Sequence, residues 1–204
     1  MKLHWSPRSP FVRKVVIAAR ETGLFDRIEC VRTRVAMTAP NRDLLPDNPL
    51  GKIPTLVLDD GSVIYDSRVI CGYLDTQHGG ARLLPEDAGA RLRVLCREAL
   101  ADGFLDALLL WRNERDRPAE ARSQPHLDAF RLKKGVILDR LERETPTFAA
   151  LPFDLAHIAT GCALSYLDFR FADENWRDGH PALAAWHEGF EARASVLATP
   201  IVDG

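Results

Sequence analysis

Long apolar runs are missing from this 204-residue sequence. A helix that crosses a bilayer needs ~20 consecutive apolar residues, and no run approaches that length. The opening residues, Met1 to Trp5, also lack the apolar core of a secretory signal peptide. We therefore expect a soluble, cytoplasmic protein without a membrane partner.

Cysteine is scarce and scattered. The four cysteines, Cys30, Cys71, Cys96 and Cys162, show no C-x-x-C spacing, which argues against a zinc site and against a disulfide framework. The six histidines are scattered as well, so no metal is expected. Three of the cysteines, Cys71, Cys96 and Cys162, fall in helical patterns and are expected to be small buried apolar side chains.

Charge of one sign is not concentrated anywhere. Lys and Arg total 27 against 29 Asp and Glu, which gives a formal net charge of -2. A surface that binds nucleic acid or anionic lipid is basic. Neither is an expected partner of this chain.

The most informative stretch covers residues 48–67. Ile53-Pro54 leads into an apolar run over 55–58, Asp59-Asp60-Gly61 is a turn signal, and a second apolar run covers 62–65. This pattern predicts a β-hairpin. The Ile53-Pro54 peptide bond is a candidate for the cis isomer, which would aim the Ile53 backbone groups toward a ligand.

Asp66 and Ser67 stand at the start of a helical pattern that extends to about His78. The first turn of a helix carries unpaired N–H groups and a partial positive charge. Asp and Ser are common caps for such a turn, and the same turn can bind an external carboxylate. The residues alone leave both interpretations open.

The sequence before this hairpin predicts a strand over 2–5 and then a helix with Ser9 as N-cap and Pro10 at its first position. The apolar spacing of this helix places three basic residues on its solvent side, Arg13, Lys14 and Arg20.

A second strand is expected over 28–31, with 33–37 as a possible third. The order strand, helix, strand, hairpin, helix predicts an α/β thioredoxin-like N-terminal domain over 1–78.

Residues 79–89 are rich in Gly and Pro, which predicts a linker. No strand signal follows it. Helical patterns cover 90–114, 127–141, 154–169 and 181–192, and the third is apolar almost throughout. We expect an all-α helical-bundle C-terminal domain over 90–204, with the third helix at its centre.

Two motifs resemble one known family. The pattern N-P-x-G-K-[IV]-P-x-L at 48–56, followed by Asp66-Ser67 at a helix start, resembles the glutathione-binding half of the cytosolic glutathione transferases. The pattern W-x-x-x-F-x-x-R-x-S-V, which begins at Trp186, resembles the closing segment of the same family. The resemblance therefore covers the whole chain.

The resemblance implies a bacterial, serine-type member, similar to the theta, zeta and omega classes. It implies glutathione as cosubstrate, a small electrophile as second substrate, a homodimer and a part in detoxification. No tyrosine occurs near the N-terminus, which argues against the tyrosine-dependent classes.

Ser9 is the candidate catalytic residue. A free thiol has a pKa of ~8.5, and a hydroxyl at a helix N-terminus can stabilise the nucleophilic thiolate by donating a hydrogen bond. Ser9 could also be only a cap, and Ser6 in the same loop is the runner-up. Ser9-Pro10-Phe11 is similar to the Cys-Pro-Phe of omega-type members, but serine forms no mixed disulfide, which favours conjugation over thiol exchange.

Glutathione itself would be held as the resemblance implies. The Ile53 backbone beside Pro54 would pair with the cysteinyl backbone, Asp66 and Ser67 would take the γ-glutamyl amine and carboxylate, and Lys52 would reach the glycyl carboxylate.

The second substrate is expected between the two domains. Candidate lining residues are Trp5, Arg8, Phe104, Leu108, Trp111 and Arg112, with Tyr166 or Phe169. Their mixed character indicates a small, partly apolar electrophile. A glutathione-dependent peroxidase, isomerase or dehalogenase, or a non-catalytic glutathione-binding protein, would use the same site.

One motif departs from the family. Its innermost helix begins with a Ser or Thr cap and an Asp three residues later, whereas this chain has Asp154 and His157 at those positions. We expect the change to weaken a folding motif, with His157 structural rather than catalytic.

Overall fold

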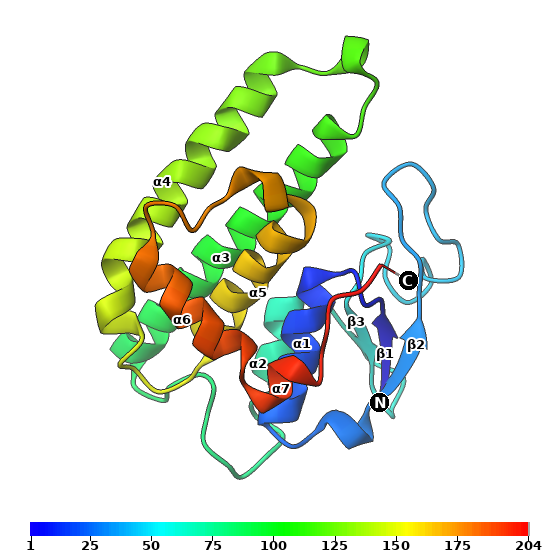
Figure 1. Cartoon of the computed structure of the whole chain (residues 1–204). Helices are drawn as coiled ribbons and strands as arrows, with labels where there is room; N and C mark the ends of the chain where they lie inside the picture. Colours follow the sequence, from blue (N-terminus) through cyan, green and yellow to red (C-terminus); the bar gives the residue numbers. More distant parts are fainter. Residues whose placement is uncertain (204) are drawn as a thin grey trace. The chain divides into compact units, whose positions relative to one another are not determined.

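The computed structural model describes residues 1–203 (Figure 1), and they pack into two compact units. The first unit joins Met1–Val94 to the segment that starts at Ala194, and the second is Leu95–Arg193. A small mixed sheet with helices forms the first, and helices form the second, which confirms the predicted fold class. The domain boundaries at 78 and 90 stay a prediction.

A four-stranded sheet forms the core of the first unit. Its strands are β1 (Lys2–Trp5), β2 (Glu29–Arg32), β3 (Thr55–Val57) and β4 (Val63–Ile64), in the order β2-β1-β3-β4. β1 is parallel to β2 and antiparallel to β3, which is antiparallel to β4. The predicted hairpin is confirmed. Residues 33–37 form no strand apart from an isolated bridge.

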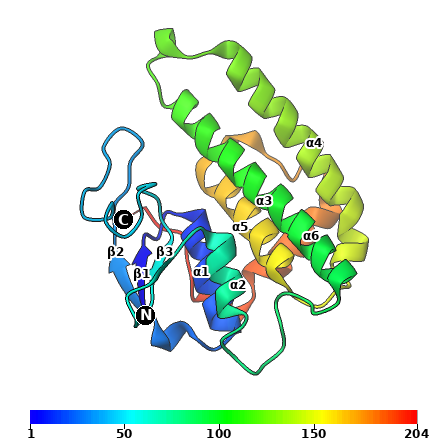
Figure 2. The same cartoon turned by 180° about the vertical axis from the view of Figure 1, so that it is seen from behind.

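The two helices of this unit, α1 (Pro10–Glu21) and α2 (Ser67–Leu74), lie side by side on one face of the sheet (Figures 1 and 2). α1 begins with Ser9 as N-cap and Pro10 at its first position, as predicted. It is followed by Gly23, whose φ of 69° suits a residue without a Cβ.

The predicted solvent side of α1 is wrong for two of its three basic residues. Arg13 is 5% exposed and Lys14 is 0% exposed. The C-terminal segment covers this helix, because Arg13 Nε donates to the Thr199 carbonyl at 2.9 Å and the Ser195 hydroxyl donates to the Glu21 carboxylate. Short α7 (Ala194–Leu197) begins that segment. The apolar spacing within α1 cannot show that a segment at the other end of the sequence packs over its basic residues.

α2 ends at Leu74 and not at His78 as predicted. Asp75 follows it, and its carboxylate accepts hydrogen bonds from the Leu83 N–H at 2.6 Å and the Leu84 N–H at 3.1 Å. Leu83 and Leu84 are buried. The Gly- and Pro-rich segment is therefore anchored to the end of α2.

Four long helices account for most of the second unit. They are α3 (Ala88–Arg115), which starts in the first unit, α4 (Gln124–Phe148), α5 (Leu155–Arg170) and α6 (Pro181–Glu191). Every residue of α5 from Leu155 to Leu167 is buried, which confirms its central position. α4 continues beyond the predicted end at Leu141, with Pro146 inside it.

Two of the three helical cysteines are buried as predicted, Cys71 and Cys162. Cys96 is exposed, so that prediction is wrong. The apolar residues Leu92 and Leu95, close to Cys96 on α3, are exposed as well.

The start of α5 keeps a complete capping box despite its histidine. The His157 N–H donates to Asp154 Oδ1 at 3.1 Å, and the Asp154 N–H donates to His157 Nδ1 at 3.3 Å. His157 Nε2 also lies 3.1 Å from the Phe148 carbonyl. The geometry of the box is kept, although His157 Nδ1 also lies 2.7 Å from Asp154 Oδ1 and can either donate to that oxygen or accept from the Asp154 N–H. That histidine weakens the motif stays a prediction. His157 is structural, as expected.

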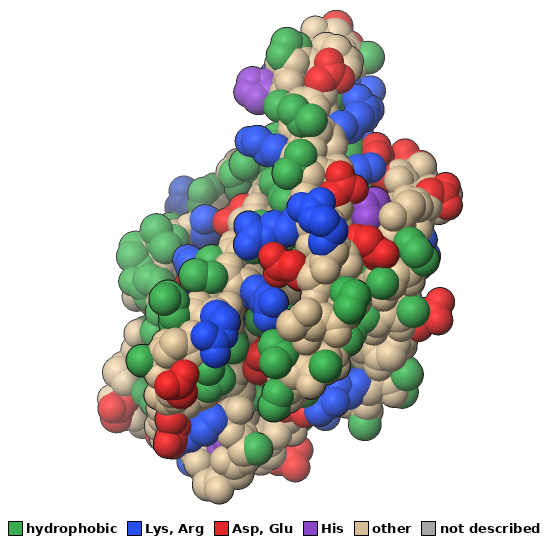
Figure 3. Space-filling view, turned by 90° about the vertical axis from the view of Figure 1, so that its left-hand side faces the viewer, with side chains coloured by type: hydrophobic (Ala, Val, Ile, Leu, Met, Phe, Trp, Pro, Cys, Tyr) green, Lys and Arg blue, Asp and Glu red, His purple; other side chains and the backbone are tan. Residues whose placement is uncertain are grey.

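Oppositely charged side chains form ion pairs along α4: Arg131 pairs with Asp128, and Arg140 pairs with Glu144. On the face seen in Figure 3, basic and acidic side chains alternate and form no large patch of one sign. Within residues 1–203, none of the helices is both long enough and apolar enough to cross a membrane.

The packing of α5 against α6 gives a direct stability prediction. A Cβ added at Gly161 would lie 2.3 Å from two ring atoms of buried Phe190. We expect Gly161→Ala to lower the free energy of unfolding by about 1 to 3 kcal/mol, measured by urea denaturation, because the ring must shift.

Gly103→Ala is the matched control. Gly103 lies inside α3 with nothing within 4 Å of an added Cβ, so this change should raise stability by roughly 0.5 to 1 kcal/mol. Equal stabilities of Gly161→Ala and wild type would contradict the packing of Phe190 on α5.

Candidate functional site

Strand register brings the predicted site segments of the first unit together. His4 pairs with Thr55 across β1 and β3, and Leu56 pairs with Ile64 across β3 and β4. In antiparallel pairs, the end of one strand lies beside the start of the next. The segments that meet at this edge are the Ser6–Ser9 loop after β1, Ile53-Pro54 before β3, and Asp66-Ser67 after β4.

Ser9 caps α1 and keeps a hydroxyl proton. Its Oγ accepts a hydrogen bond from the Val12 N–H at 3.3 Å. A serine hydroxyl has a donor in addition to its acceptor lone pairs, and no acceptor for that proton occurs among residues 1–203. Capping and donation to a ligand are therefore compatible in one side chain.

Ser6 shares the loop with Ser9. The Ser9 N–H donates to the Ser6 carbonyl at 3.2 Å, which closes a turn. Both serines are half-buried. The structure keeps both hydroxyls as candidates.

The Ile53-Pro54 peptide bond is cis. In the described part of the chain, neither the N–H nor the carbonyl of Ile53 makes a hydrogen bond. The backbone next to the start of β3 is thus open to pairing with an extended peptide, in the way that a strand is added to a sheet edge.

A buried amide that sequence reasoning missed holds this loop. Asn48 Nδ2 donates to the Lys52 carbonyl at 3.1 Å and to Thr55 Oγ1 at 2.9 Å, and Asn48 Oδ1 accepts from the Leu50 N–H at 3.0 Å. Thr55 Oγ1 donates to the same Lys52 carbonyl at 2.8 Å. The sequence held one indication of this role, since Asn48 is the first residue of the N-P-x-G-K motif. The Lys52 side chain itself is exposed.

Asp66 caps α2 and pairs with an arginine that the sequence analysis did not single out. Asp66 Oδ1 accepts from the Arg68 N–H at 3.0 Å, and Oδ2 accepts from Arg68 Nη2 at 3.0 Å. Burial would raise the pKa of Asp66, but these bonds outweigh it and the pKa is lowered. Ser67 is buried, and within the described residues its N–H has no acceptor.

A second carboxylate ties the same loop to β1. Asp47 Oδ2 lies 2.8 Å from His4 Nε2 and accepts from Lys2 Nζ at 3.1 Å. The hydrogen bond with His4, and then that with Lys2, hold the pKa of Asp47 below its usual range. His4 Nδ1 lies 2.9 Å from Thr33 Oγ1.

Most of the predicted acceptor residues lie in the second unit. Phe104, Leu108 and Trp111 of α3 are buried, and Trp111 packs on Phe171 with 4.6 Å between ring centroids. These contacts are those of core side chains. Their place in an acceptor pocket stays a prediction.

Arg112 and Tyr166 do meet. Arg112 Nη1 donates to the Tyr166 hydroxyl at 3.1 Å. Burial raises the pKa of Tyr166 although nearby arginines oppose it, so the phenol stays neutral. Arg8 belongs to the first unit, where it is exposed and lies 3.4 Å from Asp203.

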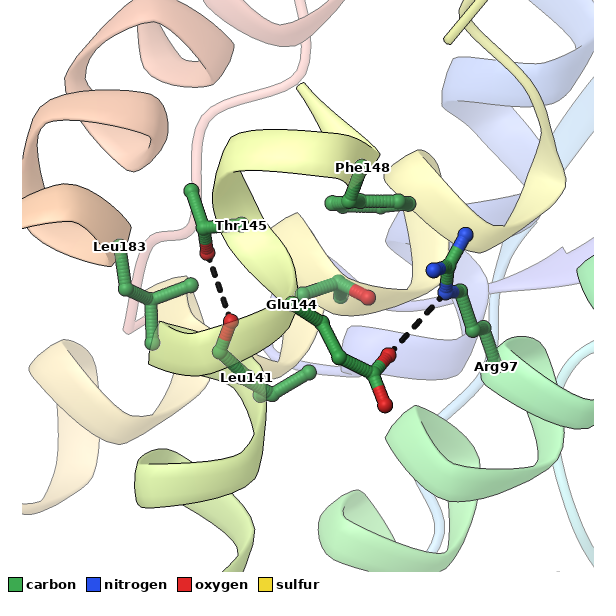
Figure 4. A pocket seen from close by; sticks show the side chains of 7 residues that line it. Arg97, Leu141, Glu144, Thr145, Phe148 and Leu183 are labelled. Atoms are coloured by element: carbon green, nitrogen blue, oxygen red, sulfur yellow. Dashed lines mark hydrogen bonds and ion pairs between the residues drawn. The ribbon is translucent and has the colours of Figure 1, made fainter. Parts of the chain in front are cut away.

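A cavity in the second unit is too small for a ligand. Its volume is about 10 Å³, and Figure 4 shows Arg97, Glu144 and Phe148 among its lining. A cavity needs ~10 to 15 Å³ to hold even one water. Burial would raise the pKa of Glu144, but hydrogen bonds from Arg140 and Arg97 outweigh it and lower the pKa.

Metal ligands do not gather either. Within residues 1–203, no group of three or more His, Cys, Asp or Glu side chains is arranged to hold a metal ion.

Two family models match the chain, the glutathione S-transferase N-terminal domain over 8–77 and the C-terminal domain over 137–189. An uncharacterized GST-like protein of Escherichia coli, YibF, is 37% identical over 202 residues, which cover 98% of each chain. This chain belongs to the glutathione S-transferase family. The resemblance read from the motifs is confirmed.

Solved members of the glutathione S-transferase family share the fold. A glutathione transferase family member from Pseudomonas fluorescens Pf-5, with bound glutathione, is 46% identical with a TM-score of 0.95, over 99% of each chain. A glutathione S-transferase from Methylobacillus flagellatus KT, with glutathione bound, is 36% identical with a TM-score of 0.88, over 98% of this chain and 99% of that one.

The Asp47 contacts predict a pH-dependent stability difference. A carboxylate with a lowered folded pKa adds stability above its unfolded pKa of ~3.9 and loses it as pH falls through the folded pKa. Asp47→Asn should therefore lower the free energy of unfolding by roughly 1 kcal/mol at pH 6, with the difference from wild type shrinking toward pH ~2.

Urea denaturation across this pH range is the measurement. Asp43→Asn, which removes an exposed carboxylate from the same loop, should change little at any pH. A difference for Asp47→Asn that stays constant with pH would show that its ion pair is not the cause.

Proposed function

We propose that this protein is a glutathione transferase that joins the glutathione thiolate to a small, partly apolar electrophile. The supporting observation is the convergence, at one sheet edge, of the open Ile53 backbone, the Asp66-Ser67 helix start and the Ser9 hydroxyl. The glutathione held by the Pseudomonas and Methylobacillus relatives supports the choice of cosubstrate.

Glutathione would lie along this edge. Its cysteinyl backbone would pair with the Ile53 N–H and carbonyl, and its γ-glutamyl carboxylate would bind the Ser67 N–H at the positive end of α2. Asp66 is held anionic by Arg68, and its two oxygens keep acceptor capacity for the γ-glutamyl ammonium. Lys52 would reach the glycyl carboxylate, and as an exposed lysine it would add little.

Ser9 would supply the activation. Lowering a thiol pKa by two units requires ~2.7 kcal/mol of preference for the anion. A hydrogen bond to a charged group contributes ~1.5 to 3 kcal/mol, and a helix N-terminus adds ~0.3 to 1 kcal/mol. Together these suffice. The thiolate would attack an electrophilic carbon, whose leaving group departs with the bonding pair. With a peroxide it would attack one oxygen, the O–O bond would break with release of an alkoxide or hydroxide, and a second glutathione would reduce the resulting sulfenic acid to the disulfide with loss of water.

The acceptor side would draw on residues of α3 and α5. Arg112 and Tyr166, which are joined by a hydrogen bond, would offer polar groups to the acceptor. The buried side chains of Phe104, Leu108 and Trp111 would form the apolar packing behind them. Isomerase, dehalogenase and peroxidase reactions would share the glutathione site and differ in the acceptor, so turnover across electrophile classes separates them.

Ser9→Ala tests the proposal. We expect the pKa of bound glutathione, followed by thiolate ultraviolet absorbance, to return toward ~8.5, and turnover near pH 6.5 to fall ~10- to 100-fold. The loss should shrink above the free-thiol pKa. Stability should also fall by about 1 kcal/mol through the lost cap.

Two variants separate donation from capping. Ser9→Asp keeps a strong cap but has no proton to donate when ionised, so it should be folded and inactive. Ser6→Ala should keep activity and the low thiol pKa. If Ser6→Ala loses both while Ser9→Ala keeps them, the thiolate is held by Ser6. Undetectable glutathione binding at millimolar concentration would end the transferase proposal.

A homodimer is the expected assembly, and the α3 surface supports it. Leu92 is 62% exposed and Leu95 is 39% exposed, and Cys96 and Ala99 continue the same helical face, also exposed. Such an apolar stripe on one helix suits a symmetric contact with a second copy of the chain.

Leu95→Glu tests this assembly. It should convert the protein to a monomer in sedimentation velocity, because two buried like charges would face each other across a two-fold axis. Leu132→Glu, which changes a 70% exposed leucine on α4, is the matched control and should leave the dimer intact. A Leu95→Glu protein that still sediments as a dimer would place the interface elsewhere.

A further inference from the structure

A second cavity lies within the first unit. Its volume is about 220 Å³, and it is bounded by the end of β1 and the loop after it, by α1, by the short 3-10 helix η1 (Phe25–Arg27), by β2 and by the C-terminal segment. Figure 1 shows that segment, in red, alongside blue α1. Its lining includes Trp5, Ser6, Val16, Arg20, Phe25, Cys30 and Pro200.

The size and walls of the cavity suit one ring. An apolar cavity of ~150 Å³ is enough to take up benzene in another protein, and this one is larger. Trp5, Val16, Phe25 and Pro200 give it mainly apolar walls. A single aromatic ring with a small polar group therefore fits.

The charged side chains that line the cavity favour an anionic ligand. Two arginines and no acidic side chain are among its lining residues. Arg20 Nε is buried and has no hydrogen-bond partner within residues 1–203, and its guanidinium lies over the Phe25 ring, 3.7 Å from the centroid. A buried charged N–H without an acceptor is unfavourable. A carboxylate would supply that acceptor in the planar geometry that a guanidinium prefers.

The other arginine, Arg13, forms part of the cavity wall and already has a hydrogen-bond acceptor. Arg13 Nε donates to the Thr199 carbonyl at 2.9 Å, and this bond is buried. It holds the C-terminal segment against α1, so an occupant of the cavity would contact both. Burial raises the pKa of the Cys30 thiol although Arg20 opposes it, so the thiol is neutral at pH 7 and does not compete for Arg20.

We propose that this cavity is a ligand site for a small aromatic monocarboxylate, with the carboxylate on Arg20 and the ring between Phe25 and Pro200. Ser6 lines one end of it, whereas Ser9, Ile53, Asp66 and Ser67, which are assigned to glutathione, do not. The site does not depend on transferase activity. The bound acid would strengthen the attachment of the C-terminal segment to α1.

Benzoate is the probe, titrated by calorimetry into the full chain saturated with glutathione. We expect benzoate to bind, and benzamide, its neutral isostere, to bind at least about tenfold more weakly because the charge-assisted bond is lost. Arg20→Gln should weaken benzoate by a similar factor. Arg27→Gln removes the same charge from an exposed position on η1 and should leave the affinity unchanged.

A filling variant tests the place of the ring. Val202 lines the cavity and is exposed on its other side, so Val202→Trp should fill the cavity and abolish binding without disturbing the core. Circular dichroism and the urea midpoint verify that each variant is folded. No benzoate binding to wild type, or equal affinity in Arg20→Gln or Val202→Trp, overturns the proposal.

Cys30 gives an independent readout. In a Cys96→Ser background, which removes the other exposed thiol, benzoate should slow alkylation of Cys30 by iodoacetamide. In Arg20→Gln the protection should disappear. Unchanged alkylation with benzoate bound, or displacement of benzoate by glutathione, would place it in another site and overturn the proposal, while leaving the transferase proposal untouched.

Discussion

The site depends on one constraint, the register in which β1 pairs with β3 and β3 with β4. Leu3 pairs with Leu56, and both are fully buried. A slip of one residue would turn each strand's buried side chains to the opposite face, so the core fixes the register. Because the register is fixed, the loop after β1, the peptide before β3 and the helix start after β4 must end at the same edge. Packing of apolar side chains thus decides where the polar groups of the candidate site gather.

Polar bonds then set the finer geometry at that edge. Asn48 uses one buried amide to hold two parts of the loop that contains Lys52, and Asp47 beside it binds His4 on β1. Removing one partner of such a buried bond leaves the other unsatisfied, which costs more than the bond contributes. Ser9 works differently. Its acceptor lone pair stabilises α1 while its proton stays available, so a folding requirement and a chemical one are met by different parts of one hydroxyl.

Sequence reasoning succeeded where the signal was local. The Ser9-Pro10 helix start, the Asp-Gly hairpin and the cap at Asp154 are each read within a few residues, and the structure confirms them. It failed where a distant segment decides the outcome: burial of Arg13 needs Thr199, and the end of α2 at Leu74 needs the two leucines bound by Asp75. In the candidate site, motif spacing selected Ile53, Asp66 and Ser67. Asn48 also belongs to the motif, but its role as a buried hydrogen-bonding amide was not predicted. The cavity at Arg20 was not predictable, because five separate segments build it.

The C-terminal segment links the cavity at Arg20 to α1, the helix that Ser9 caps. It holds α1 through the buried bond from Arg13 to Thr199, across a separation of 186 residues, and through the bond from Ser195 to Glu21. An exposed pair between Arg8 and Asp203 joins it to the loop before α1. Exposed pairs contribute ~0 to 1 kcal/mol, whereas an unmade buried bond to a charged group costs several times that. The buried bond therefore dominates the attachment. Ser9 lies between Arg8 and Arg13, so the segment that closes the cavity also restrains the first turn of α1, where the candidate hydroxyl is carried. Arg13 is thus the direct link between the C-terminal segment and the helix that Ser9 caps.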